Sequence, residues 1–276
     1  MEIRIKPCIV MLSLITILLL ILGCQSPSSH GKYELPGVVS YDLKKALRLG
    51  NLVYELDLMG ERLDTFPNEF TNLRNLRSLS LVGCLNLDFE IVIGLLDSLD
   101  KLSELELSKC QLTSLPSKTS NLQKLERLDL SNNFLQDIPG SLGKLPYLKK
   151  LSLASNRLTE LPSQLRESTF LDEIYLYDKE SIQIDYVIYV LTAIDSIKII
   201  DLSFSRLHII PPEIGNLIQV ETLILAGNQI ETFPKEIQNL KNLKHLWLGV
   251  NPISEEELAR LEVLIPNTKI NFNDRF

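Results

Sequence analysis

The chain has 276 residues, enough for one large domain or for a solenoid built from repeats. Lys and Arg total 28 while Asp and Glu total 35, which gives a net charge of −7. This acidic balance, with no basic run longer than a short pair, argues against a nucleic-acid partner. The composition also excludes a collagen-like or disordered chain.

Residues 1–23 have the pattern of an export signal. Arg4 and Lys6 give a positively charged start, and an almost wholly apolar run of 15 residues extends from Cys8 to Leu22. A permanent transmembrane helix needs about 20 apolar residues. We therefore expect a signal peptide rather than a membrane span.

The end of this run, Ile21-Leu22-Gly23-Cys24, resembles the lipobox of bacterial lipoproteins. The resemblance implies cleavage before Cys24, acylation of Cys24 with palmitate-like chains, and export to the bacterial cell envelope. Two or more acyl chains make such an attachment lasting. Gln25 stands where an Asp would favour inner-membrane retention in some bacteria, so the outer membrane is favoured. An ordinary signal peptide or an uncleaved anchor is the alternative.

The segment after the signal is small, polar and turn-forming, so residues 24–38 are expected to be a flexible tether. Residues 39–276 are expected to form the folded domain with its caps. Its first element is an amphipathic helix over residues 41–48, with Ser40 before it as the N-cap and Gly50 after it. This helix is expected to cap the N-terminal end of the fold.

The pattern L-x-x-L-x-L-x-x-N-x-L-x-x-L-P then recurs along the chain, most clearly from Leu125 to Pro139. Six of the eight intervals between copies are 23 residues long and two are 26. Nine copies in one register resemble the leucine-rich-repeat family, in its bacterial form with L-P, over residues 41–272. The copies begin at Val53, Leu76, Leu102, Leu125, Leu148, Leu171, Ile197, Val220 and Leu243.

Elementary physics supports the same architecture. Alternating leucines such as Leu151 and Leu153 predict a short strand with one face buried, and stacked strands form a parallel sheet. We therefore expect an α/β solenoid of about nine coils, a horseshoe whose concave face is the sheet. The Asn of each coil can satisfy backbone groups that the turn leaves unpaired. Asn133, Asn156, Asn228 and Asn251 fill this slot, whereas Glu61, Cys84, Cys110, Lys179 and Ser205 replace it. Lys179 is the real departure, so its coil is expected to be distorted.

The two 26-residue coils match each other at an offset of 95, which indicates that coils two to five were duplicated as coils six to nine. Their segments 87–100 and 182–195 have apolar residues at spacings of three and four, which predicts helices on the convex side. At the other end of the domain, Ser254 precedes three glutamates and a helix that stops at Pro266, and residues 268–272 can add a final strand.

The sequence carries no motif of a hydrolase, nucleotide-binding loop or metal centre. His30 lies in the tether, and His208 and His245 lie in different coils, so no metal site, cofactor or enzyme activity is expected. Cys84 and Cys110 occupy the same slot of adjacent coils, about 5 Å apart at Cα. Either a disulfide or two buried thiols would fit.

Function in a solenoid of this kind is expected on the side chains that point outward from the concave sheet. The first coils carry acidic groups there and the last coils carry apolar and aromatic ones, the residue types that dominate binding energy. We expect a monomer that binds a protein partner through this face, with a structural scaffold or carbohydrate binding by the aromatic patch as alternatives. The candidate residues are Glu104, Glu106, Asp129, Tyr175, Tyr177, Ile199, Phe204, Ile224 and Trp247.

Overall fold

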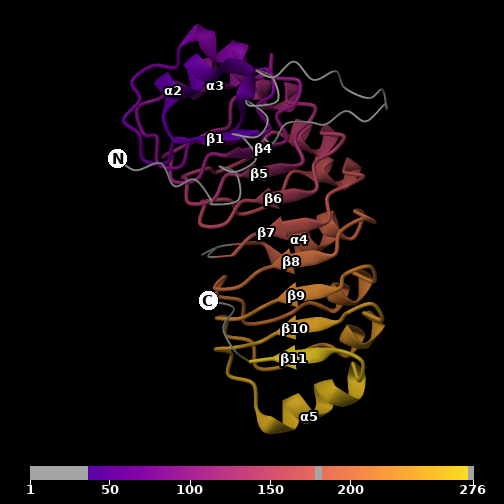
Figure 1. Cartoon of the computed structure of the whole chain (residues 1–276). Helices are drawn as coiled ribbons and strands as arrows, with labels where there is room; N and C mark the ends of the chain where they lie inside the picture. Colours follow the sequence, from indigo (N-terminus) through magenta and orange to yellow (C-terminus); the bar gives the residue numbers. More distant parts are fainter. Residues whose placement is uncertain (1–36, 178–181, 273–276) are drawn as a thin grey trace, which may run out of the picture. The chain divides into compact units, whose positions relative to one another are not determined.

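The computed structural model describes residues 37–177 and 182–272, and the predicted signal peptide, Cys24 and Lys179 lie outside these ranges. Within them, eleven strands form one sheet in chain order, so each coil pairs with the next (Figure 1). All neighbouring pairs are parallel. The strands are β1 (Val38–Ser40), β2 (Val53–Asp57), β3 (Ser78–Ser80), β4 (Glu104–Glu106), β5 (Arg127–Asp129), β6 (Lys150–Ser152), β7 (Glu173–Tyr175), β8 (Ile199–Asp201), β9 (Thr222–Ile224), β10 (His245–Trp247) and β11 (Lys269–Asn271). The predicted parallel-sheet solenoid is confirmed.

The core is a set of rows that run through the coils. One inward-facing residue from each of β2 to β10 pairs in register across the sheet, and each is at most 1% exposed: Leu56, Leu79, Leu105, Leu128, Leu151, Ile174, Ile200, Leu223 and Leu246. Each coil therefore buries its apolar residues against its neighbours, as expected where single repeats are too small to hold a core.

Helical segments form the opposite layer of each coil (Figure 1). The two longer coils contain the predicted helices, α3 (Phe89–Leu96) and α4 (Ile184–Leu191). The shorter coils contain five-residue 3-10 turns, each directly after a proline, because a first helical turn does not need the N–H that proline lacks. They are η2 (Asn68–Asn72), η3 (Ser117–Asn121), η4 (Gly140–Lys144), η5 (Ser163–Glu167), η6 (Pro212–Asn216) and η7 (Lys235–Asn239).

The N-terminal end of the stack differs in detail from the sequence expectation. The N-cap of α2 (Leu43–Leu49) is Asp42, whose carboxylate accepts a 2.7 Å bond from the Lys45 amide. Ser40, the expected cap, instead belongs to β1, a strand that the sequence did not predict. A short turn, η1 (Gly50–Leu52), leads into β2. At the C-terminal end, Ser254 caps α5 (Glu255–Leu264) and β11 follows.

The asparagine slot has the predicted role. Asn133 Oδ1 accepts 3.0 Å bonds from the amides of Cys110 and Leu112, and its Nδ2 donates to the carbonyls of Leu107 and Leu130. Asn156, Asn228 and Asn251 repeat this pattern. The residue before the slot has a left-handed φ between 49° and 72° in all eight of these turns that the structure describes, at Gly60, Gly83, Lys109, Asn132, Ser155, Phe204, Gly227 and Val250.

Candidate binding surface

The outward-facing side chains of the sheet form two rows, because the central residue of each strand points inward. The first row is Glu55, Ser78, Glu104, Arg127, Lys150, Glu173, Ile199, Thr222 and His245, and the second is Asp57, Ser80, Glu106, Asp129, Ser152, Tyr175, Asp201, Ile224 and Trp247. Five candidate residues therefore share the second row. Tyr177 and Phe204 follow the ends of their strands.

The three acidic candidates differ in what they contact. Glu104 is half-buried and pairs with Arg127 of the next strand, with 3.5 Å between Oε1 and Nη1. Asp129 Oδ1 accepts a 2.8 Å bond from the Ser131 amide, so this carboxylate shapes the turn after β5. Glu106 lies exposed between them. Of the three, Glu106 thus offers the most accessible charge to a partner.

Lys150, Glu173 and Tyr175 form a cluster at the middle of the sheet that the candidate set included only in part. Lys150 Nζ lies 3.2 Å from Glu173 Oε2 and 4.6 Å from the centre of the Tyr175 ring, and the Tyr175 hydroxyl donates a 2.7 Å bond to the same carboxylate oxygen. Burial raises the pKa of Tyr175, and the bond to Glu173 raises it further. The phenol therefore stays protonated and holds its ring in a fixed position.

The apolar candidates are only partly accessible. Phe204 is 41% exposed, whereas Tyr177, Ile199 and Trp247 are half-buried. Ile224 is 2% exposed, so the expectation that it offers surface to a partner was wrong. Ile224 lies between Asp201 of β8 and Trp247 of β10 in the second row, and side chains this close on one face of a sheet can cover one another.

Phe204 lies against the next coil. A Cβ added to Gly227 would come within 2.3 Å of the Phe204 ring, so the ring rests on the glycine backbone. Gly227 also has a φ of 69°, and both features explain why glycine stands there. The aromatic side chain is therefore held flat against the end of the strand instead of projecting freely.

The surface shows no chemistry beyond binding among the described residues. No group of three or more His, Cys, Asp or Glu side chains in the described ranges could hold a metal ion. Cys84 and Cys110 are both free and buried, and their thiols donate to the carbonyls of Leu58 and Leu81 at 3.3 and 3.1 Å. Burial raises the pKa of Cys84 to about 11, which keeps this thiol protonated and unreactive.

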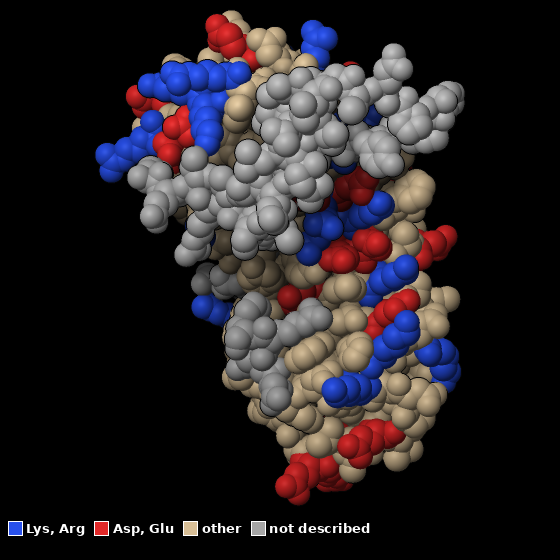
Figure 2. All heavy atoms as spheres, in the orientation of Figure 1, with Lys and Arg blue, Asp and Glu red and all other residues tan. Residues whose placement is uncertain are grey.

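Charges of both signs also follow one another along the stack (Figure 2). Lys149 pairs with Glu126 at 2.8 Å and Lys244 with Glu221 at 2.6 Å, each one coil apart. These exposed pairs contribute little to stability individually. The surface around these pairs is polar, which contrasts with the apolar candidates on the sheet.

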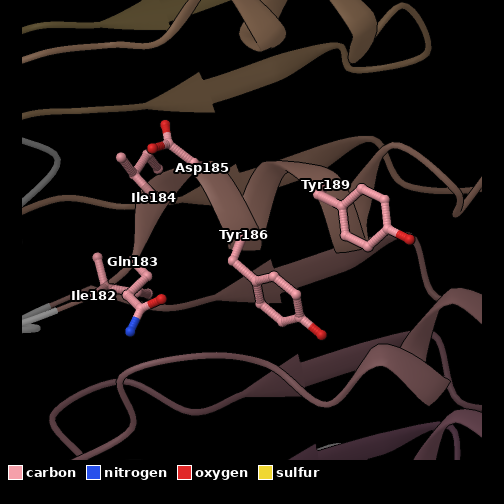
Figure 3. Close-up of a pocket in the computed structure, with 6 residues that line it drawn as sticks. All are labelled: Ile182, Gln183, Ile184, Asp185, Tyr186 and Tyr189. Carbon is pink, nitrogen blue, oxygen red and sulfur yellow. The ribbon is translucent and has the colours of Figure 1, made fainter.

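A second feature was missed by the sequence analysis, which treated α4 only as a packing helix. A hollow of about 550 Å³ lies at the start of α4 and is lined by Ile182, Gln183, Ile184, Asp185, Tyr186 and Tyr189 (Figure 3). The signal was present in the sequence, because Tyr186 and Tyr189 stand where the matching helix α3 has Ile91 and Gly94.

Two models of known protein families match segments of the repeat region. The model of the leucine rich repeat family matches residues 100–158, and a second model, leucine rich repeats in two copies, matches residues 218–262. Both models match parts of the chain, and its fold is that of a leucine-rich-repeat solenoid. No curated protein matches it in sequence. Among the described residues, no helix has the length and apolar character to span a membrane.

Solved structures share this fold at low identity. An internalin (inlF) from Listeria monocytogenes is 20% identical, with a TM-score of 0.63 over 84% of this chain and 66% of its own. The leucine-rich repeat domain of the type III effector XopL is 20% identical, with a TM-score of 0.64 over 83% of this chain and 79% of its own. The plant peptide hormone receptor RGFR1, solved in complex with RGF2, is 25% identical, with a TM-score of 0.52 over 82% of this chain and 37% of its own. The chain thus spans 66% of the internalin and 37% of the receptor.

Proposed function

We propose that this chain is a non-catalytic module that binds a protein partner on the outward face of its sheet. The observation that carries the proposal is the fixed row of Glu106, Tyr175 and Trp247 across one parallel sheet. Aromatic groups on a rigid surface contribute most of the energy in protein interfaces. Leucine-rich-repeat proteins generally mediate interactions between proteins, and their domains are typically non-catalytic.

The cluster of Lys150, Glu173 and Tyr175 supports this role. Its hydrogen bonds and its cation–π contact hold Tyr175 in place before any partner arrives. A side chain that is already ordered loses less conformational entropy on binding. The scaffold alternative gives no reason to order an aromatic ring on the sheet in this way.

Photo-crosslinking tests the proposal on the full-length protein in its native cells. A crosslinking amino acid at His245, exposed in the first outward row, should capture one dominant protein. The matched control places it at Ile218, which is 59% exposed and follows η6 on the opposite layer. Equal capture from both positions, or none from His245, would support the scaffold alternative.

We further propose that an acylated Cys24 anchors the chain to the cell envelope, with the outer membrane favoured over the inner by Gln25. This rests on the lipobox-like Ile21-Leu22-Gly23-Cys24. Cys24→Ala should abolish incorporation of a palmitate analogue and leave the signal uncleaved. Equal labelling of the wild type and the variant would refute acylation at this residue, and density fractionation of the membranes tests which one holds the protein.

A further inference from the structure

The two long helices of the solenoid are internal copies with different exposed faces. At the offset of 95, three buried positions agree and are at most 1% exposed in both: Val92 and Val187, Ile93 and Ile188, Leu96 and Leu191. Among the positions that differ, Tyr186 replaces Ile91 and is partly buried against the core, and Tyr189 replaces Gly94 and is exposed. Because α3 packs with isoleucine and glycine there, the fold does not need the two tyrosines of α4.

The two rings form one aromatic surface. The centres of Tyr186 and Tyr189 lie 5.8 Å apart with 36° between their planes, and Tyr189 is 49% exposed. The Arg166 guanidinium of η5 lies 4.2 Å from the centre of the Tyr189 ring and also donates to its hydroxyl group. Arg166 thus fixes the ring from one side and leaves much of it open.

Polar and apolar groups are separated around the hollow. Gln183 and both tyrosines project from one side of the start of α4, whereas Asp185 projects from the other (Figure 3). The side that carries the tyrosines therefore combines two aromatic rings, two hydroxyl groups and one neutral amide, with the Arg166 guanidinium beside Tyr189. The hollow is formed by residues of a single helix start, which is much smaller than the roughly 20–30 residues that each side of a standard protein interface contributes.

We propose that this hollow binds a glycan, with pyranose rings stacked on Tyr186 and Tyr189. The axial C–H groups of an all-equatorial pyranose form an apolar face that fits the aromatic face, while its hydroxyl groups need hydrogen-bond donors and acceptors. Gln183 supplies both through its amide. The spacing of the two rings is close to the repeat of one sugar in a β-1,4-linked chain. An open hollow lets such a chain continue past both ends of the site.

The ligand class follows from this geometry: β-1,4-linked glucopyranosides, including their N-acetylated forms. The site lies in the helical layer and not on the outward face of the sheet, so it is independent of the proposed protein-binding surface. A protein could in this way hold a glycan on one side and a protein partner on the other.

Saturation-transfer NMR tests the proposal with cellohexaose and chitohexaose as probes. The full-length protein is kept in a detergent without a sugar headgroup, and the transfer to sugar ring protons is measured. We expect transfer from the wild type and its loss in the double variant Tyr186→Ile/Tyr189→Gly, which carries the residues of α3 and should fold. Gln183→Ala should weaken binding by about fivefold, the effect of one hydrogen bond.

Control variants test whether the glycan binds at this hollow or elsewhere on the protein. Tyr147→Ala removes another surface tyrosine, 46% exposed and also stacked with a cation, and should leave the transfer unchanged. Absence of transfer to both probes, or equal transfer from the wild type and the double variant, would overturn the proposal. Loss of transfer in Trp247→Ala would also overturn it, because the glycan would then lie on the sheet. A photo-crosslink from position 189 to a cellular protein would assign the site to a protein instead.

Discussion

The amide of Cys110 donates a 3.0 Å hydrogen bond to Oδ1 of Asn133, the residue that fills the same slot one coil later. Each asparagine in the slot therefore stabilises the turn of the coil before it. Cys84 and Cys110 keep one part of this pattern, because their thiols still donate to a carbonyl of the preceding coil. A thiol sulfur is a weaker hydrogen-bond acceptor than an amide oxygen, so these two residues stabilise the preceding turn less than an asparagine does.

Asn133→Ala should strongly destabilise the domain. The change leaves the buried amides of Cys110 and Leu112 without their acceptor, and each such group costs about 1–3 kcal/mol. We expect the free energy of unfolding to fall by at least about 2 kcal/mol in urea melts. Asn72→Ala, at an exposed position, should stay within about 0.5 kcal/mol of the wild type. Similar losses in both variants would show that the slot bonds do not hold the coils together.

The leucine rows, the asparagine slots and the two helices could be predicted because each follows from a period in the sequence. The left-handed residues before the slots could not, since Lys109, Phe204 and Val250 are not residue types that favour this conformation. The repeat backbone imposes it on whatever stands there. Sequence reasoning therefore recognises the repeat better than the strain that individual residues bear within it.

The candidate site was predictable only as a row of positions. Register placed Ile224 on the outward face, but its burial depends on how the side chains beside it pack. The cluster of Lys150, Glu173 and Tyr175 likewise depends on the rotamers that bring three side chains from two strands together. The spacing of residues along the chain predicts neither the burial of Ile224 nor the contacts within this cluster.

Val250→Gly should stabilise the domain. Val250 has a φ of 58° and is 69% exposed, so its β-branched side chain bears backbone strain with little burial to offset it. Glycine removes the strain, and we expect a gain of about 1 kcal/mol in the free energy of unfolding. Val250→Ala keeps a Cβ and should gain much less. If alanine stabilised the domain as much as glycine, side-chain contacts rather than the backbone would be responsible.

Glu257 should contribute pH-dependent stability at the C-terminal end. Its carboxylate accepts bonds from Arg260 at 2.7 Å and from the Phe233 amide of the preceding coil at 2.8 Å. The bonds from Arg260 lower the pKa of Glu257, and the Phe233 bond acts in the same direction, although burial opposes both. The folded state thus binds this proton less readily than the unfolded chain does. Its stabilisation is complete above the unfolded pKa of about 4.3 and is lost as the pH falls through the lower folded pKa.

Urea melts at several pH values between about 3 and 6 measure this contribution. The stability difference between the wild type and Glu257→Gln should be largest at the upper end and should shrink towards the lower end. A constant difference across this range would mean that the Glu257 carboxylate is not preferentially ionised in the folded protein.

Binding of the protein partner should depend on the aromatic half of the sheet. Truncation of an anchoring aromatic side chain to alanine typically costs at least about 2 kcal/mol, so Tyr177→Ala or Trp247→Ala should weaken binding by about 30-fold or more. Glu106→Ala should mainly lower the association rate and the dependence on salt, because its exposed carboxylate acts at long range. Glu104→Ala should have a smaller effect on both, since Arg127 already neutralises that charge.

Surface plasmon resonance with the partner captured from position 245 measures these effects, and Tyr189→Gly on the opposite layer serves as the control. The aromatic variants must keep the unfolding midpoint of the wild type, so that weaker binding reflects lost contacts rather than lost structure. If Tyr177→Ala and Trp247→Ala bind like the wild type while Glu106→Ala loses affinity, the anchor lies among the first coils. The ordered Tyr175 ring would then lie at the edge of the interface, because among the aromatic candidates of the second row it is the nearest to Glu106 and Asp129.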